Sequence, residues 1–339
     1  LFGKIAINGV TLDLDSTVMT RYGTQEGAVR GYNPAKRGRA SHHPLMAFVA
    51  DLRMIANCWL RPGNSSSANN VQAFLANTLH RLGDKRVCLL RADSGFSDSA
   101  FLDHLDTQPM HYIIALRQNQ PLQRALVHAE TWWPLIDEDN RPVPGIELTR
   151  FAYQPEAWSK PRWVVGIRQH TARRADPKGK TLNLFADDPV IGSWRFSALT
   201  TDLDLPAETV WRMYRGRADC ENRIKELKYD FAADSFNMKD FWATEAALNV
   251  VMLAYNLMSL FRQVLLKTSL VRSSSGPVQH TLQTLRYKLF AKAAYITTEA
   301  RKPILNLAMT MQQRVWMKGL WDATHSFDLP AKFSPIYPP

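Results

Sequence analysis

The chain has 339 residues, which is enough for two or three domains or for one large core with an insertion. Hydrophobic residues make up 45% of it, and 42 basic against 31 acidic residues give a formal charge of +11. This balance favours polyanionic partners, nucleic acid before an anionic membrane surface. Cys58, Cys88 and Cys220 are odd in number and have no zinc or redox spacing, which is typical of a protein in a reducing cytosol.

No secretory signal opens the chain, and the longest apolar run, from Ala243 to Leu266, is interrupted by charged and amide residues. The run therefore predicts a buried helix rather than a membrane span. Its expected core residues are Phe241, Leu248, Val251, Met252, Tyr255, Leu260 and Phe261. The chain starts at Leu1 without an initiator Met, so we expect an upstream segment, an N-terminal DNA-binding region, to be missing.

The first third of the chain alternates strand-like and helix-like segments. Strands are expected within 4–15, twice within 44–60, over Val87–Asp93 and over His111–Arg117, with helices from Val71 to Leu82 and around Phe101–Leu105. Val87–Asp93 is almost wholly apolar, as a central strand buried on both faces would be. The order indicates an α/β layer with a mixed sheet.

Residues 118–200 are rich in Trp, Pro and Arg and predict a β-rich insertion, with strands near 146–153, 162–169 and 194–201. From Pro206 to about Lys267 the sequence is strongly helical. Ser273–Pro277 is a predicted linker. The region 268–339 is expected to be helical and is basic, since nine Lys/Arg against three Asp/Glu give +6.

Two aspartates close predicted strands, Asp15 in Leu-Asp-Leu-Asp-Ser-Thr and Asp93 in Leu-Leu-Arg-Ala-Asp-Ser-Gly. Side chains at strand ends converge outside the packed core, where sites are built. Their carboxylates suit Mg²⁺ or Mn²⁺. The alternative is structural: Asp15 would cap a turn and Asp93 the next helix. Asp13 lies on the same strand face as Asp15, and periodicity does not choose between them.

The predicted helix Val210–Phe231 places four polar residues on one stripe. At 3.6 residues per turn, Tyr214, Arg217, Glu221 and Lys228 fall within about 60° of one another. One acid with two bases is a poor core face, because burying charge is costly. A solvated face with an Arg217–Glu221 pair is the simpler alternative, but it gives no role to Tyr214 or Lys228.

The spacing Tyr214-x2-Arg217-x3-Glu221-x6-Lys228 matches the signature of a large group of insertion-sequence transposases. Asp15-Ser-Thr and Ala-Asp93-Ser-Gly-Phe resemble the same group. From residue 1 to about 267 the chain is most similar to the insertion sequence 1380 family. The resemblance favours Asp15 over Asp13, because the family's first aspartate precedes small hydroxyl residues.

The resemblance implies an RNase H-like core made of 1–117 and 201–267. The 118–200 segment would be the β insertion that precedes the helix with the last catalytic acid, and 268–339 a basic C-terminal helical region. Asp15, Asp93 and Glu221 would be the catalytic residues and the ligands of two Mg²⁺ ions, with Mn²⁺ able to substitute. Tyr214, Arg217 and Lys228 would contact DNA beside them.

The implied activity is metal-dependent cleavage and transfer of DNA strands at insertion-sequence ends. The implied partners are the terminal inverted repeats, target DNA and a second copy in a synaptic homodimer, in the bacterial cytoplasm at the nucleoid and without a membrane. The alternatives are a nuclease on the same fold that joins no strands, and a non-catalytic DNA-binding remnant.

Two weaker signals concern DNA contacts. Lys36, Arg37 and Arg39 lie in a polar loop and are either phosphate contacts or solvated charges. Trp194 or Phe196, just before the signature helix, would stack on a flipped base, as an insertion aromatic does in relatives with hairpin intermediates. Both aromatics also fit an ordinary strand core.

Overall fold

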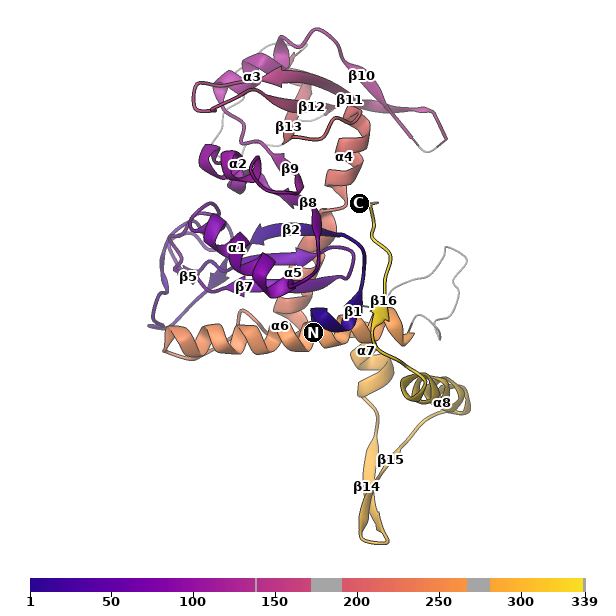
Figure 1. The fold of residues 1–339 in the computed structure, drawn as a ribbon. Helices are drawn as coiled ribbons and strands as arrows, with labels where there is room; N and C mark the ends of the chain where they lie inside the picture. The colour runs from indigo at the N-terminus through magenta and orange to yellow at the C-terminus, as the bar shows by residue number, and fades with distance from the viewer. Residues whose placement is uncertain (138, 172–190, 267–280, 338–339) are drawn as a thin grey trace.

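A mixed β-sheet forms the centre of the protein, and helices cover both of its faces (Figure 1). The structure, a computed structural model, describes residues 1–137, 139–171, 191–266 and 281–337. In this part of the chain the sheet has nine strands in the order β10-β11-β12-β13-β9-β8-β2-β6-β7. They are β2 (Val10–Ser16), β6 (Leu45–Val49), β7 (Met54–Trp59), β8 (Val87–Ala92), β9 (His111–Ala115), β10 (Trp133–Ile136), β11 (Pro142–Tyr153), β12 (Arg162–His170) and β13 (Trp194–Thr201).

The helices around the sheet are α1 (Val71–Leu82), α2 (Ser99–Leu105), α3 (Gln120–Val127), α4 (Ala207–Arg215), α5 (Ala218–Asp230), α6 (Phe241–Val264), α7 (Leu282–Leu285) and α8 (Met311–His325). Short strands β3 (Met19–Thr20), β4 (Val29–Arg30) and β5 (Ala40–His42) form a separate small sheet. Strand β1 (Ile5–Ala6) pairs with β16 (Ala331–Lys332), which ties the two ends of the described chain together. A hairpin of β14 (Ala294–Glu299) and β15 (Lys302–Leu307) projects from the body (Figure 1).

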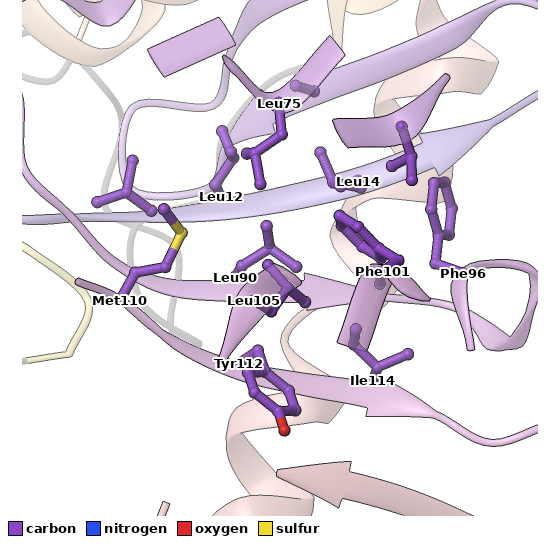
Figure 2. Close-up of a cluster of buried hydrophobic side chains, with 14 of the residues drawn as sticks. Leu12, Leu14, Leu75, Leu90, Phe96, Phe101, Leu105, Met110, Tyr112 and Ile114 are labelled. Atoms are coloured by element: carbon purple, nitrogen blue, oxygen red, sulfur yellow. The ribbon is translucent and has the colours of Figure 1, made fainter. Parts of the chain in front are cut away.

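One face of the sheet packs under α1 and α2. Leu12 and Leu14 of β2 point to this face together with Leu90 of β8, and they meet Leu75 of α1 and Phe101 of α2 (Figure 2). All five side chains are 1% exposed or less. Because side chains alternate along a strand, Asp13 and Asp15 point to the opposite face.

The opposite face carries α4, α5 and α6. Met46 and Phe48 of β6 pack there with Leu227 of α5 and with Leu248 and Tyr255 of α6. Helix α6 runs along the open edge of the sheet beside β7 (Figure 1). The helix provides hydrogen-bond partners for the backbone of this edge strand. The Asn256 side chain accepts from Ile55 N at 2.7 Å and donates to Ile55 O at 2.8 Å.

The segment predicted as a β insertion extends the central sheet. Its predicted strands correspond to β11, β12 and β13, and β13 pairs antiparallel with β9, with Leu199 opposite Ala115. Buried Arg162 of β12 fastens the segment to α2, because its guanidinium bonds both Asp103 and Asp106. The mixed α/β sheet predicted from the sequence is therefore confirmed, and nine strands share it.

The single helix predicted over Val210–Phe231 is wrong, because the chain forms α4 and α5 with a break at Gly216 and Arg217. The reason is a buried side chain. Arg91 of β8 donates to the carbonyl of Met213, and a Cβ on Gly216 would lie 2.8 Å from Arg91 Nη1. Both break residues keep right-handed helical angles, so the four polar residues still share one side.

The prediction that residues 268–339 are helical is also wrong in part. The described residues 281–337 include α7 and α8 but also the β14–β15 hairpin. Its two-residue turn is Ala300-Arg301, both at positive φ, where Gly or Asn is usual. The expected turn signal is therefore missing from the sequence. The predicted linker Ser273–Pro277 lies outside the described residues.

Helix α6 is long and apolar enough to cross a membrane by length and composition. It lies instead along the sheet, where Arg262 pairs with Glu226 of α5 at 2.9 Å and Ser259 donates to the Arg53 carbonyl. The burial predicted for α6 holds for only one face of the helix. Of the expected core residues, Leu248 and Tyr255 are buried, whereas Leu260 belongs to none of the hydrophobic clusters of the described chain.

The Asn256 contact predicts a stability difference between two matched substitutions on α6. Asn256→Leu leaves a buried N–H and C=O of the edge strand without partners, so the free energy of unfolding should fall by about 2–4 kcal/mol. Asn249→Leu removes a bond only to the Glu245 carbonyl one turn earlier and should change it by less than about 1 kcal/mol. Urea denaturation followed by circular dichroism measures both, and equal losses would contradict the role given to Asn256.

Candidate active site

Two aspartates lie side by side at the carboxyl ends of neighbouring strands. Strands β2 and β8 are parallel, with Asp13 opposite Arg91 and Leu14 opposite Ala92. The next positions in the same register are Asp15 and Asp93, and both face the side covered by α5. Adjacent parallel strands lie about 4.8 Å apart, so this register brings two carboxylates to one point at the sheet edge.

Asp15 is buried, and two contacts hold its side chain. Its Oδ1 accepts from Ser16 N at 2.7 Å, and its Oδ2 lies 3.1 Å from Arg217 Nη2, which also donates to the Leu14 carbonyl. Burial raises the pKa of Asp15 to about 6; Arg217 acts against this, while the charges of Asp93 and Glu221 add to it. The raised pKa of Asp15 therefore comes mainly from burial, and Arg217 opposes it more strongly than Asp93 or Glu221 adds to it.

An open cavity of about 580 Å³ joins these acids to the helix residues. Asp15, Asp93, Tyr214, Arg217, Glu221 and Lys228 all line it, together with Ser16, Thr17, Ser94, Ala115, Ile224, Lys225 and Tyr229. The structure thus brings the three predicted catalytic acids and the three signature partners together around one space. Glu221 is exposed, in the first turn of α5, whereas Arg217 is only 6% exposed at the start of that helix.

The signature bases differ in how they are engaged. Lys228 Nζ donates to the Val18 carbonyl at 3.0 Å, and burial lowers its pKa although Asp234 and Asp15 act in the opposite direction. For Arg217, burial alone would lower the pKa, but Asp15 and further groups outweigh it and hold the pKa above its usual value. Arg217 Nε is buried and has no hydrogen-bond partner among the described residues. Burial raises the pKa of Tyr214.

Asp13, which competed with Asp15 on sequence grounds, is fully engaged. Arg91 binds it through two parallel bonds, Nε to Oδ1 at 2.6 Å and Nη2 to Oδ2 at 2.8 Å. The third guanidinium nitrogen, Nη1, donates to the Met213 carbonyl and lies 3.3 Å from Tyr337 Oη. Asp13 is thus neutralised inside the fold, and Asp15 is the β2 aspartate that reaches the cavity.

Sequence reasoning did not identify Arg91 or Tyr337. For Arg91 a signal was present, because it is the single charged residue in the otherwise apolar run Val87–Ala92, and a charge there needs a buried partner. Tyr337 gave no signal, since it is near the chain end and more than 120 residues from Met213, whose carbonyl accepts from its hydroxyl at 3.2 Å. Both residues hold the α4–α5 junction against the sheet.

The carboxylates around the cavity have the oxygen chemistry that Mg²⁺ or Mn²⁺ requires. Asp93 Oδ1 accepts from Gly95 N at 2.9 Å and caps the short 3₁₀ helix Ser94–Phe96, whereas the predicted helix, α2, is capped by Asp98. Asp15 is bonded as described. As they stand, no three His, Cys, Asp or Glu side chains in the described residues are grouped closely enough to hold one ion. The donor set fits a divalent cation by type, charge and shared cavity.

The remaining predicted DNA contacts lie outside this cavity. Lys36, Arg37 and Arg39 are exposed in the loop between β4 and β5, with Lys36 Nζ 4.9 Å and Arg39 Cζ 5.7 Å from the Tyr22 ring centre. They stay predictions for DNA binding.

Trp194 and Phe196 are half-buried on β13. Arg168 lies 4.6 Å from the Trp194 ring, and Phe196 packs edge-on against Trp132 at 6.0 Å. These contacts favour the ordinary strand core for both aromatics.

Comparison with known proteins identifies the family of the chain. The family described as Transposase DDE domain group 1 matches residues 4–324. The chain belongs to this DDE transposase family. No curated protein matches it. Among solved structures, the cryo-EM structure of a piggyBac transposase synaptic complex with hairpin DNA is similar, with a TM-score of 0.45 and 14% identity, over 78% of this chain and 50% of that one. The chain thus spans about half the length of that transposase.

In this transposase domain the raised pKa of Asp15 predicts a pH-dependent loss of stability. The folded state keeps the Asp15 proton up to about pH 6, whereas the unfolded chain releases it near 3.8. Folding is therefore favoured by the protonated form, and stability falls as pH rises between these values, by about 3 kcal/mol.

Urea denaturation from pH 3.5 to pH 8 compares the parent with Asp15→Asn, which has no proton to lose. Because Asn leaves Arg217 without its counter-charge, the informative quantity is how the difference in unfolding free energy changes with pH. The parent should lose about 3 kcal/mol relative to Asp15→Asn across this range. A difference that does not vary with pH would contradict the raised pKa.

Proposed function

We propose that this transposase domain cleaves DNA at the ends of an insertion sequence and joins the freed ends to target DNA, with Asp15, Asp93 and Glu221 as its catalytic carboxylates. The observation that supports this most is that these acids come from three distant chain segments and line one open cavity. Arg217 and Lys228 line it as well, so positive charge lies beside the acids, as DNA phosphates would require.

The strand order supports assigning an RNase H-like core to residues 1–117 and 201–267. Strands β7, β6 and β2 are antiparallel neighbours, and β8 and β9 follow β2 in parallel, with α1 and α2 on one face and α5 on the other. Strands β10 to β13, within 118–200, then form the insertion before the helix with the last acid. The insertion sequence 1380 family remains our closest assignment, on the Tyr214, Arg217, Glu221 and Lys228 spacing.

Two divalent cations, Mg²⁺ or Mn²⁺, held by Asp15, Asp93 and Glu221 would stabilise charge on the attacking and leaving oxygens of the phosphodiester. Side chains around the acids would orient the carboxylates and the DNA. Arg217 is 6% exposed and bonds both Asp15 and the Leu14 carbonyl, so we assign it to orienting Asp15 rather than to the predicted phosphate contact. Lys228 remains a candidate phosphate contact, because its ammonium has further donors beyond the bond to Val18.

DNA is the proposed partner, as terminal repeats and as target, and two ends would require two copies of the domain. A nuclease that joins no strands and a DNA-binding remnant are the competing functions. Strand joining with a pre-cut transposon end separates the first of these from a transposase. Retention of all three acids around one cavity weighs against the remnant.

Glu221→Gln should abolish cleavage while keeping the fold. Glu221 is exposed, so its neutral amide costs little stability, but the loss of one metal-ligand charge should reduce strand cleavage at least about 100-fold. Cleavage of a labelled transposon end in Mg²⁺, with DNA binding by anisotropy, measures both properties.

Glu208→Gln is the matched control, because Glu208 lies in the first turn of α4, outside the cavity, and pairs only with Arg212. It should cleave like the parent. Cleavage by Glu221→Gln within tenfold of the parent would remove Glu221 from the catalytic set. Thermal stability in Mg²⁺ gives a second readout, since a lost metal ligand should diminish any rise in melting temperature that the parent shows.

Replacing Lys36, Arg37 and Arg39 together by Ala should weaken DNA binding uniformly across sequences. If each contacts one phosphate, the slope of log K against log salt should fall by up to about 3. The control replaces Arg81, in the last turn of α1, together with Lys85 and Arg86, which directly precede β8 at the end of that strand away from Asp93. Equal slopes for both triple variants would contradict a specific role for the loop.

A further inference from the structure

Helix α6 carries a continuous apolar stripe that the described residues leave exposed or half-buried. The stripe consists of Ala243, Ala246, Val250, Leu253, Leu257, Leu260 and Val264. None of these belongs to a hydrophobic cluster of the described residues. Val250 is 67%, Leu253 52% and Leu257 51% exposed. Single exposed apolar residues are ordinary, but a contiguous row along a helix marks an interaction surface.

The spacing of the stripe is regular. Successive members are 3 and 4 residues apart in strict alternation over the whole helix. This is the 3.5-residue period of a coiled-coil seam, in which side chains of one helix fit between those of a partner helix with the same period. We call these seven residues the α6 seam. The pattern therefore specifies another helix as its complement.

The rest of α6 keeps the seam pointing outward. Leu248, Tyr255 and Arg262 are also seven residues apart, lie opposite the seam on the helical wheel, and are buried against the core. Asn256 fixes the helix to β7, and Arg262 binds Glu226 of α5. If α6 entered a membrane, these hydrogen bonds to the sheet and to α5 would be lost. A lipid bilayer is therefore a poor partner for the stripe.

We propose that the α6 seam binds the α6 seam of a second copy of this chain, with the two helices antiparallel. In that arrangement Leu253 of one copy faces Leu257 of the other, Val250 faces Leu260, and Ala246 faces Val264. Ala246 and Val250 then each meet a larger side chain, whereas parallel helices would set Ala246 against Ala246 and leave space unfilled. Antiparallel helix dipoles are also favourable neighbours.

The residues beside the seam suit a self-complementary pair. Those flanking it on one side are Ala247, Ala254 and Phe261. Those on the other are Asn249, Asn256 and Gln263, of which Asn256 and Gln263 bond the backbone of Ile55 and Leu52. Since none carries charge, a second copy meets no like-charge repulsion, although the chain as a whole has a net charge of +11. The seam covers about 30 Å of helix at about 1.5 Å per residue.

This surface is independent of the proposed chemistry, because it needs neither DNA nor the cavity acids. It predicts a dimer of the 339-residue chain in solution without DNA. Sedimentation velocity of the unmodified chain should show it, and Leu253→Lys should give a monomer because it places a charge in the seam. Leu305→Lys is the matched control, since Leu305 is 62% exposed on the β14–β15 hairpin, away from α6, and should leave the dimer intact.

A paired charge substitution tests the antiparallel arrangement. Leu253→Lys and Leu257→Glu should each give monomers, whereas the double variant should regain the dimer, because the introduced lysine of each copy then faces the introduced glutamate of the other. Recovery also proves that the single variants fold. A monomeric parent, a dimeric Leu253→Lys, a double variant that stays monomeric, or binding of the parent to neutral phosphatidylcholine vesicles in place of dimerisation would each overturn the proposal. Unchanged DNA cleavage in the monomeric variants would leave the seam standing and bear only on whether cleavage needs the dimer.

Discussion

The buried pair of Asp13 and Arg91 is the contact around which the catalytic face is built. Two charges at 2% and 1% exposure are tolerable only because they neutralise each other through two hydrogen bonds. The same guanidinium captures the Met213 carbonyl and Tyr337 hydroxyl, so one side chain joins β2, β8, the α4–α5 junction and the chain end. Removing one partner of such a pair typically costs about 3–5 kcal/mol. Here it would also release the helix that carries Glu221, so stability and site geometry depend on one interaction.

The cavity above this pair is lined by three carboxylates, Asp15 among them. Asp13 and Asp15 sit two residues apart on one strand, yet their surroundings differ. Asp13 has a fully matched arginine, whereas Asp15 shares Arg217 with the backbone and faces Asp93 and Glu221. Carboxylates that line an open cavity can act as cation ligands, whereas the matched pair beneath it cannot. The two aspartates of the strand therefore differ in role because their partners differ: Asp13 supports the fold, and Asp15 is available in the cavity.

Much of the sheet could be predicted because strand ends and alternation are local properties. Asp15 and Asp93 follow apolar runs, and β11, β12 and β13 fall at their predicted positions. The features that were missed depend on distant partners or on a turn without its usual residues. The break at Gly216 follows from Arg91, more than 120 residues earlier, and the hairpin turn at Ala300-Arg301 lacks Gly or Asn. Leu260 is apolar and stands in an apolar run, so the sequence predicts burial. Only the position of α6 on the sheet edge shows that it faces outward. The roles of the site residues rest on the family signature and on their shared cavity.

The pairing of β13 with β9 has a mechanical consequence. Because Leu199, Thr200 and Thr201 are bonded in register to Ala115, Ile114 and Ile113, the inserted strands and the strands bearing the aspartates form one sheet. A hinge needs a few residues free to change their backbone angles, and a hydrogen-bonded ladder offers none. The upper part of the molecule in Figure 1 therefore cannot swing toward the cavity as a lid without shearing that ladder. It serves as a fixed wall, and any adjustment on binding a long polymer must come from bending the polymer or from elements outside the sheet.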